Sequence, residues 1–333
     1  MKRTNISVFI PHIGCPHRCS FCDQRSISGA AHAPTPQEVS ELLEGQAQHL
    51  SDIGMTAEIA FFGGSFTAIP RSYMVSLLEC AGSAVEKYPQ VYSGIRCSTR
   101  PDCIDEETVS LLKKYGMTAV ELGAQSMSGE VLEANERGHS PEDVRRAAKL
   151  IRESGISLGL QMMTGLYKDS EDAVRLTCRE FIAMKPDTVR IYPTVILKGT
   201  RLGELYESGE YRSFGFEQTV DLCAELLREF TGAGIRVIRM GLHASKDVER
   251  DMLGGVYHPA FREIVESRLF LRDAEKLLSR LPQGEYTLYT DPKDISRLTG
   301  QKRRNIAELA EMGYSVRVKP CAGEYIRAEK SLK

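Results

Sequence analysis

Hydrophobic and polar positions follow two alternating patterns along the first 195 or so residues. Short β-branched or apolar runs predict strands, and longer stretches with helical period predict helices. The predicted strands are residues 6–13, 57–62, 94–98, 118–122, 156–163 and 188–192. The predicted helices are residues 37–52, 71–87, 106–115, 129–153 and 171–184, the fourth being interrupted near Gly138 and restarting at Ser140-Pro141-Glu142. The pattern therefore indicates six βα repeats.

Strict alternation of strands and helices with short connections predicts right-handed crossovers and a parallel sheet. The period alone does not separate an open doubly wound sheet from a full or partial barrel. In both, ligands gather at the carboxyl ends of the strands. Unusual residues follow these ends: cysteines after the first strand, Gly63-Gly64-Ser65 after the second, Arg100 after the third, Gln125 after the fourth and Gly165 after the fifth. We therefore expect them on one rim.

The pattern changes in the last third of the chain. Residues 216–231 and 259–278 read as helices, and residues 235–240 as a further strand. The last 48 residues predict a strand at 286–289, a helix at 292–298, a turn at 300–303, a helix at 305–312 and a strand at 315–318. We predict a barrel over residues 1–245, a helical connector over 246–284 and a small βααβ unit over 285–333.

Composition agrees with a cytoplasmic protein. The 333 residues leave room for a barrel of about 200 to 250 residues and an appendage. With 42% hydrophobic and 26% charged residues, the chain has no apolar run near the roughly 20 residues of a membrane span, and its first apolar run stops at Pro11, too early for a signal peptide. We expect no membrane association. A net charge of −2 gives no global attraction for nucleic acid, so any such binding needs a local patch.

Nine cysteines in a chain of this kind favour metal binding or chemistry over disulfides, because cytosolic thiols stay reduced. Cys15, Cys19 and Cys22 lie in one loop at x3 and x2 spacing, close enough to ligate one metal centre. A 4Fe–4S cluster with three cysteine ligands keeps one iron open for a small molecule. The alternatives are three unrelated thiols, or a structural zinc site with His12 or His17 as fourth ligand.

The segment CPHRCSFC at residues 15–22 resembles the CxxxCxxC signature of the radical S-adenosylmethionine (SAM) superfamily. In that family the open iron binds SAM, and an electron from the cluster cleaves it to methionine and a 5′-deoxyadenosyl radical. Residues 61–67 resemble the glycine-rich segment that holds the methionine amino group, and residues 159–166 resemble the segment that flanks the adenine. The resemblance implies a partial (βα)6 TIM-like barrel with a carboxyl-terminal extension, a 4Fe–4S cluster and SAM.

The same resemblance suggests which residues touch SAM. Glycines 63 and 64 let backbone groups approach the zwitterionic methionine part of SAM closely. The guanidinium groups of Arg100 and Arg137 could bind its carboxylate through two parallel hydrogen bonds. The expected cofactor-binding residues are Phe21, Gly63, Gly64, Ser65, Thr67, Ser98, Arg100, Gln125, Arg137, Met162 and Tyr192. The alternatives are an ordinary strand-to-helix corner for the glycines, loop packing for Phe21, and structural ion pairs for the two arginines.

Within the superfamily, residues 98–102, 120–126, 137–139 and 186–193 resemble the Elongator catalytic subunit family, which modifies wobble uridine in tRNA and adds an acetyltransferase domain. This chain departs at Ser98, where a glutamate is expected, and its last 90 residues do not have the pattern of an acetyltransferase. Oxygen-independent coproporphyrinogen oxidase is also similar, but Ser7 and Gln24 stand where its tyrosine and further cysteine are expected. Porphyrin chemistry is therefore disfavoured.

Residues 285–333 contain ten Lys or Arg against seven Asp or Glu. The turn GQKRRNI at 300–306 resembles the GxxG loop of KH domains, with Arg303 in place of the second glycine. Lys302, Arg303 and Arg304 are the predicted RNA contacts, and a solvated basic helix start is the alternative. The sequence thus predicts a radical SAM enzyme, with RNA or tRNA as a candidate substrate and a ferredoxin or flavodoxin as electron donor. The competing hypothesis is a non-catalytic protein that binds a cluster, SAM, and RNA or haem.

Overall fold

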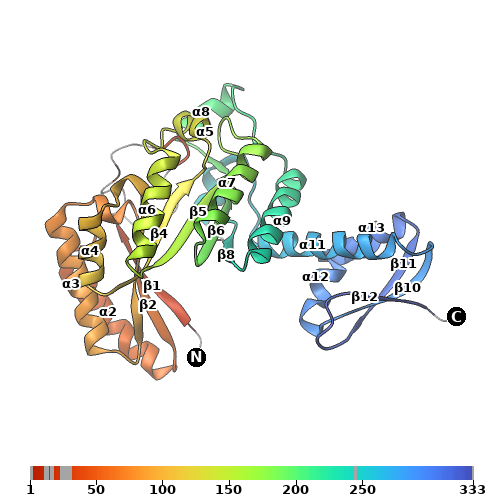
Figure 1. The fold of residues 1–333 in the computed structure, drawn as a ribbon, viewed down its shortest axis with the longest axis horizontal. Helices are drawn as coiled ribbons and strands as arrows, with labels where there is room; N and C mark the ends of the chain where they lie inside the picture. Colours follow the sequence, from red (N-terminus) through yellow and green to blue (C-terminus); the bar gives the residue numbers. More distant parts are fainter. Residues whose placement is uncertain (1–2, 11–14, 16–18, 23–31, 244–245, 332–333) are drawn as a thin grey trace.

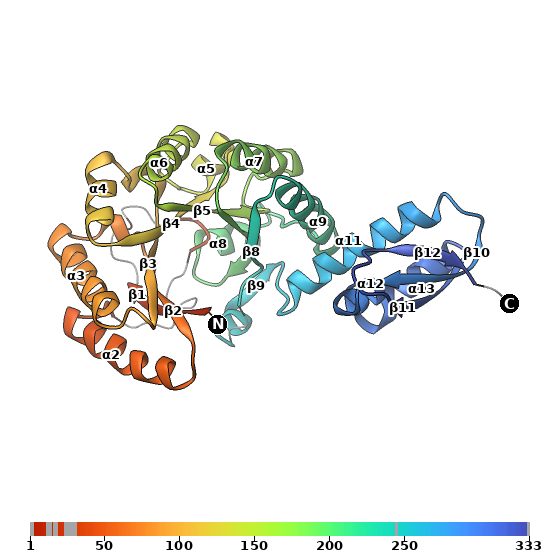
Figure 2. The same ribbon diagram turned by 60° about the horizontal axis from the view of Figure 1, so that its bottom comes forward.

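The computed structural model describes residues 3–10, 15, 19–22, 32–243 and 246–331. Its main element is a parallel sheet of seven strands in the order β1-β2-β3-β4-β5-β6-β8. The strands are β1 (Arg3–Ile10), β2 (Thr56–Gly63), β3 (Tyr92–Thr99), β4 (Met117–Gln125), β5 (Ser157–Thr164), β6 (Thr188–Pro193) and β8 (Arg236–Met240). The sheet curls, and helices cover its outer face (Figures 1 and 2).

The covering helices are α2 (Pro36–Asp52), α3 (Arg71–Lys87), α4 (Glu106–Lys114), α6 (Pro141–Glu153), α7 (Glu171–Met184) and α9 (Phe216–Gly232). Alternate strand residues such as Ile59, Phe61 and Leu160 are buried beneath them in the main core. The other residues of each strand face the concave side, where the Arg190 guanidinium of β6 lies 5.7 Å from the ring centroid of Phe62 on β2. Because these strands are not neighbours, the contact crosses the interior of a half-barrel. The predicted partial barrel is confirmed, with β8 as a seventh strand.

Several short elements were not predicted. They are β7 (Val195–Leu197), α8 (Arg201–Glu207), α10 (Lys246–Asp251) and β9 (Met252–Gly255), whereas α5 (Gly129–Ala134) is the first part of the predicted helix 129–153, before its interruption near Gly138. The two strands pair antiparallel with each other, more than 50 residues apart in the chain. Gly255 makes this possible, because its φ is +87° and a Cβ there would lie 2.3 Å from the Thr194 carbonyl oxygen. Such short segments have no period of their own and depend on a distant partner.

The carboxyl-terminal unit contains β10 (Gly284–Thr290), α12 (Ile295–Thr299), α13 (Arg304–Glu311), β11 (Tyr314–Pro320) and β12 (Arg327–Lys330). The predicted βααβ order is present, and β10 and β11 pair in parallel. The strand β12 is additional and pairs antiparallel with β10. Both views show this unit beside the half-barrel, connected to it by the long helix α11 (Phe261–Leu278) (Figures 1 and 2).

Helix α11 contributes to two hydrophobic cores. Phe261 and Val265 belong to the core of the half-barrel, whereas Phe270, Leu271 and Leu278 belong to the core of the carboxyl-terminal unit. The barrel core therefore continues beyond residue 245, and the segment expected as a connector is shared between both bodies. No helix in the described part of the chain has the length and apolar character needed to cross a membrane.

Candidate functional site

The cysteine loop follows β1, and its described residues are Cys15 and residues 19–22. The Cys22 amide donates to the Cys19 carbonyl at 3.1 Å, so these two cysteines share a tight turn. Ser20 fixes this turn to the end of α5, because its amide donates to the Asn135 carbonyl at 3.2 Å and its hydroxyl donates to the Asn135 side-chain oxygen at 2.7 Å. Both residues are buried. The loop is thus fixed at the rim where the strands end.

In the described part of the chain, no three His, Cys, Asp or Glu side chains converge as a metal site. The assignment of Cys15, Cys19 and Cys22 as cluster ligands therefore remains a prediction from their spacing. His12 and His17, the alternative zinc ligands, and Gln24 lie outside the described residues.

Arg137 gives the cysteine loop an electropositive neighbour. Its Nη1 lies 2.8 Å from the Cys19 sulfur, and its guanidinium carbon lies 5.8 Å from the ring centroid of Phe21. Its Nη2 donates to the Gly123 carbonyl at the end of β4. The Nε of Arg137 is buried without a hydrogen-bond partner among the described residues, so a donor is available here. A positive charge and a free donor beside the Cys19 sulfur fit a negatively charged group such as a cysteine-ligated cluster.

Arg100 is held differently. It is 4% exposed, and its guanidinium forms a two-point ion pair with Asp102, with Nε–Oδ1 and Nη2–Oδ2 distances of 3.0 Å each. The Arg137 carbonyl accepts a further hydrogen bond from Arg100 Nη2. The structure thus contains the ion pair that was the alternative to a contact with the SAM carboxylate. It also shows that Arg100 supports the backbone beside Arg137.

The glycine turn after β2 packs closely against β1. Gly63 has a φ of +108°, and a Cβ there would lie 2.8 Å from the Ile10 carbonyl oxygen. The same oxygen accepts a hydrogen bond from the Gly64 amide at 2.8 Å. Position 63 therefore requires glycine, because β2 approaches β1 closely at Ile10. Ile10 is the last residue of β1, just before the cysteine loop.

Ser65 and Thr67 form a hydroxyl network with Thr99, a residue that the sequence did not single out. The Ser65–Thr99 and Thr67–Thr99 oxygen distances are 2.8 and 2.6 Å. Ser65 also accepts a hydrogen bond from the Arg100 amide at 3.1 Å, and Thr67 donates to the Cys103 carbonyl at 2.7 Å. The network ties the end of β2 to the end of β3. It places both predicted hydroxyls on the rim beside Arg100.

Further predicted residues lie on the inner face. Ser98 donates to Glu121 at 3.3 Å, and the hydroxyl of Tyr192 lies 3.3 Å from Arg190 Nη1. Gln125 ends β4 with a φ of +66° and accepts a hydrogen bond from Gln161 at 3.3 Å. By contrast, Met162 is fully buried in the main core, on the helix side of β5. At that level the inner face is formed by the residues on either side of Met162.

Glu121 is the central inner-face residue that the sequence analysis missed. It is 3% exposed, and its Oε2 lies 2.6 Å from Arg190 Nε and 3.7 Å from Arg96 Nη2. Glu121 reaches β6 across β5 because the intervening residue is Gly159, where a Cβ would lie 3.3 Å from the Glu121 Cγ. Glu121 lay inside a motif quoted for the Elongator family, but its partners depend on strand register and could not be inferred from spacing.

His139 follows the Arg137-Gly138 turn and is 6% exposed. Its Nε2 lies 3.2 Å from the Ala124 carbonyl oxygen. Burial, together with the neighbouring Arg137 charge, lowers the pKa of His139 to about 4. The imidazole is therefore neutral near pH 7 and has a structural part in holding the turn.

The basic turn of the carboxyl-terminal unit is exposed. Lys302 and Arg303 both adopt left-handed backbone, with φ values of +50° and +64°, and neither has an ion-pair partner within the described residues. Arg304 differs, because its Nη1 lies 2.9 Å from Glu217 at the start of α9 and its Nε lies 2.7 Å from Glu308. Two of the three predicted RNA contacts are thus available to a ligand, whereas Arg304 links the unit to the half-barrel.

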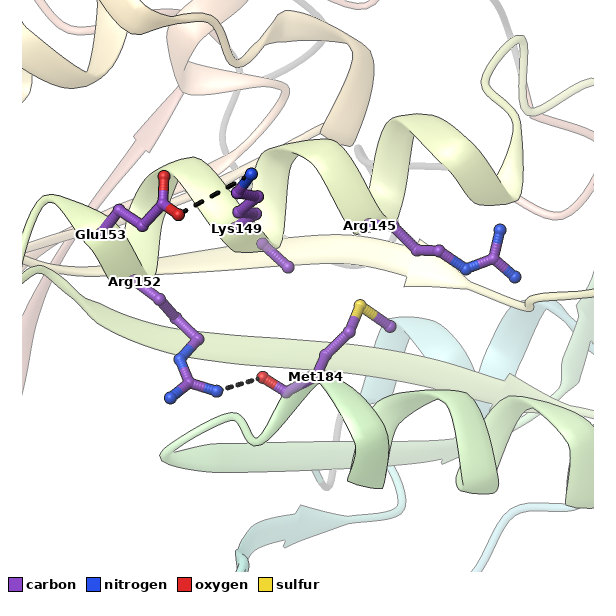
Figure 3. A pocket seen from close by; sticks show the side chains of 6 residues that line it. Arg145, Lys149, Arg152, Glu153 and Met184 are labelled. Atoms are coloured by element: carbon purple, nitrogen blue, oxygen red, sulfur yellow. Dashed lines mark hydrogen bonds and ion pairs between the residues drawn. The ribbon is translucent and has the colours of Figure 1, made fainter.

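A shallow hollow of about 410 Å³ lies elsewhere, on the outer surface between α6 and the end of α7 (Figure 3). Its basic side chains already have partners: Arg145 pairs with Glu142 and Glu180, and Lys149 pairs with Glu153. Arg152 donates to the Met184 carbonyl at 2.6 Å. The hollow is on the helical side of the sheet, remote from the strand ends, so we do not assign it to the candidate site.

Comparison with known proteins identifies the family. Residues 9–181 match the radical SAM superfamily and residues 186–270 match the radical SAM carboxyl-terminal domain. An uncharacterised protein of Methanocaldococcus jannaschii is 30% identical over 66% of this chain and 70% of its own length. The tRNA uridine(34) acetyltransferase of the same organism is 34% identical over 50% of this chain, and mouse Elongator complex protein 3 is 30% identical over 64%. This chain covers only 34% and 41% of those two proteins.

Solved structures agree in fold. Elp3 of the archaeon Methanocaldococcus infernus superposes with a TM-score of 0.62 at 20% identity, over 81% of this chain and 63% of that one. Methylornithine synthase superposes with a TM-score of 0.54 at 16% identity, over 81% of this chain and 82% of that one. The family match spans more than half of the chain, including the cysteine loop. The chain therefore belongs to the radical SAM superfamily of enzymes.

Proposed function

We propose that this protein cleaves SAM reductively at a 4Fe–4S cluster held by Cys15, Cys19 and Cys22, and that the resulting radical acts on a nucleoside in RNA. The observation that carries the first part is the family match over residues 9–181, which contains the CxxxCxxC loop. When bound, the cluster and SAM supply the 5′-deoxyadenosyl radical. The chain itself supplies ligation, orientation and a site shielded from water.

Each protein group has a defined part in this proposal. Arg137 contacts the Cys19 sulfur and, with Phe21 beside it, borders the place where SAM would bind. The backbone at Gly63 and Gly64 presents polar groups at short range, and the hydroxyl network of Ser65, Thr67 and Thr99 fixes that turn. On the inner face, Gln125 and Tyr192 border the space beneath the rim.

RNA as the substrate is supported by two observations of different kinds. Relatives named tRNA uridine(34) acetyltransferase and Elongator complex protein 3 are similar to the present protein over 34% and 41% of their own chains. The exposed turn with Lys302 and Arg303 offers two cations without ion-pair partners among the described residues, at the place where a KH domain contacts the sugar-phosphate chain. The acetyltransferase activity of those relatives is not part of the proposal.

The first test is SAM cleavage by the reconstituted protein. After anaerobic assembly of the cluster, dithionite and SAM should yield 5′-deoxyadenosine, measured by liquid chromatography. The triple variant Cys15→Ala/Cys19→Ala/Cys22→Ala should yield none, whereas Cys321→Ala, which removes a thiol from the carboxyl-terminal unit, should match the wild type. A protein that binds the cluster and SAM without catalysis would give the background of the triple variant, and a zinc protein would lack absorption near 400 nm.

The second test concerns RNA. The variant Lys302→Glu/Arg303→Glu should bind bulk tRNA about tenfold or more weakly at low salt, because two phosphate-contacting cations are reversed. The matched control Arg317→Glu/Lys319→Glu makes the same charge change on the exposed face of β11 and should bind normally. Equal affinity of both variants and the wild type would remove the turn from the proposal.

The reductant is proposed to be a ferredoxin or flavodoxin. Replacing dithionite by reduced flavodoxin in the first assay should support 5′-deoxyadenosine formation. Modified nucleosides in total RNA from wild-type and deletion strains should then identify the target position.

A further inference from the structure

Charged side chains form a row across the inner face of the half-barrel, in which acids and arginines alternate. Arg96 on β3 lies 3.2 Å from Glu58 on β2 and 3.7 Å from Glu121 on β4. Glu121 in turn lies 2.6 Å from Arg190 on β6. Arg96, Glu121 and Arg190 are all largely buried. Opposite charges thus neutralise one another from β2 to β6.

The alternation ends at the edge strand. Arg239 on β8 is the register partner of Arg190, so two arginines lie directly opposite each other on neighbouring strands. Within the described residues, no carboxylate lies within ion-pair distance of Arg239, and its side chain contacts the imidazole of His243 instead. Like charges placed opposite one another destabilise a sheet unless an anion lies between them.

Other positively charged groups lie close to Arg239. Arg239 is half-buried, and burial together with the charges of Arg190 and Arg262 lowers its pKa. Burial and the charges of Arg239 and Arg190 likewise lower the pKa of His243. Arg262 is not available for neutralisation, because it pairs with Glu266 and donates to the Val237 carbonyl. Arg190 and Arg262 thus have their own carboxylate partners, whereas Arg239 has none within the described residues.

The position of Arg239 and His243 gives a substrate access to them. Arg239 is the penultimate residue of β8, near the carboxyl end of the strand, and the exposed His243 follows four residues after it. Tyr192, 3.3 Å from Arg190, lies on the same inner face. A group that enters the half-barrel from the rim at this edge meets a guanidinium fork and an imidazole together.

We propose that Arg239, Arg190 and His243 form an anion subsite that holds a phosphate group of the nucleotide on which the radical acts. This inference rests on the proposed function in RNA and adds that the enzyme recognises the target residue as a nucleotide. Guanidinium groups bind phosphate oxygens through two parallel hydrogen bonds, and Arg190 and Arg239 are register partners on adjacent strands, with Arg239 lacking a carboxylate partner among the described residues. A phosphate beside Arg239 would continue the row of alternating negative and positive groups formed by Glu58, Arg96, Glu121 and Arg190.

The test uses the full chain without SAM or reductant, so that it is independent of the radical chemistry. Uridine 5′-monophosphate and inorganic phosphate should raise the Tm of the wild type in a concentration-dependent way, whereas uridine and acetate should not. Arg239→Gln should weaken binding of uridine 5′-monophosphate about tenfold or more, because one charge-assisted contact is lost. Arg236→Gln, which removes an exposed arginine at the start of the same strand, is the matched control and should bind normally.

Arg239→Glu provides a second and opposite measurement. It places an acid beside Arg190, so we expect a Tm above that of Arg239→Gln and no dependence of Tm on phosphate. Equal stabilisation of wild type and Arg239→Glu by phosphate would overturn the subsite, and so would equal binding of uridine and its monophosphate. Stabilisation by acetate as strong as by phosphate would overturn the assignment to a nucleotide. If phosphate binds as expected but RNA is never modified, the subsite stands and the RNA substrate fails.

Discussion

His139 lies two residues after Arg137 and is buried against the end of β4, so its protonation is coupled to the stability of the fold around this turn. Its pKa lies near 4 in the folded protein, because burial and Arg137 oppose protonation, against an ordinary value of 6.5. Between these values the unfolded chain binds a proton that the folded protein does not. This contribution to stability is complete above pH 6.5 and is lost as the pH falls towards 4.

We therefore expect His139→Gln to flatten the acid side of the stability profile. In the cluster-free protein, the fall in unfolding free energy from pH 6.5 to 4 should shrink by up to about 3 kcal/mol relative to wild type. Urea titrations at several pH values measure this. Asp169, whose pKa burial raises to about 6, acts in the opposite direction but is present in both proteins. His49→Gln, at an exposed position on α2, should follow the wild type, and a parallel profile for His139→Gln would contradict the assignment.

Strand ends and turns bring the candidate site together, and the glycine after β2 is the clearest example. Gly63→Ala should lower the unfolding free energy by about 1 to 3 kcal/mol, because the backbone is left-handed and the new methyl group meets the Ile10 carbonyl. Gly82→Ala within α3 is the control, since its Cβ finds only an ordinary contact at 3.8 Å and helix propensity favours alanine. Equal stability of both variants in urea would show that the backbone of β1 at Ile10 shifts to make room for the methyl group.

At the scale of single elements, the sequence predicted the strands and helices that have a regular hydrophobic pattern of their own. The strands and helices of the half-barrel have their own hydrophobic period, and β2, expected at 57–62, is found at Thr56–Gly63. The pair β7 and β9, the strand β12 and the ion pair from Glu121 to Arg190 were not predicted. Each depends on a partner more than 30 residues away, and strand register decides which residues meet. Thr99 was missed for the same reason, since its hydroxyl partners Ser65 and Thr67 lie in the turn after the neighbouring strand.

At the scale of the whole molecule, α11 makes the two bodies interdependent. Arg268 strengthens the link, because its guanidinium pairs with Glu217 and Asp221 on α9 at 2.5 and 2.6 Å. We expect Leu271→Ala, in the core of the carboxyl-terminal unit, to cost about 2 to 5 kcal/mol and to loosen α9 as well as β10. Hydrogen exchange read by mass spectrometry tests this. Loss of protection confined to residues 284–331 would show that the unit unfolds alone.

Helix α11 also determines how the carboxyl-terminal unit is rotated about the helix axis relative to the half-barrel. It has 18 residues, so it spans about 27 Å, and each residue turns the chain by about 100°. One residue inserted between Val265 and Phe270 would move the turn with Lys302 and Arg303 by only about 1.5 Å along the axis but would rotate it by roughly a quarter turn or more about the helix. Seven inserted residues would nearly restore the orientation at about 10 Å greater distance. The orientation of the basic turn and its distance from the half-barrel can therefore be varied separately. If only the seven-residue insertion is tolerated, orientation limits the modification of a bound polynucleotide; if only the one-residue insertion is tolerated, distance limits it.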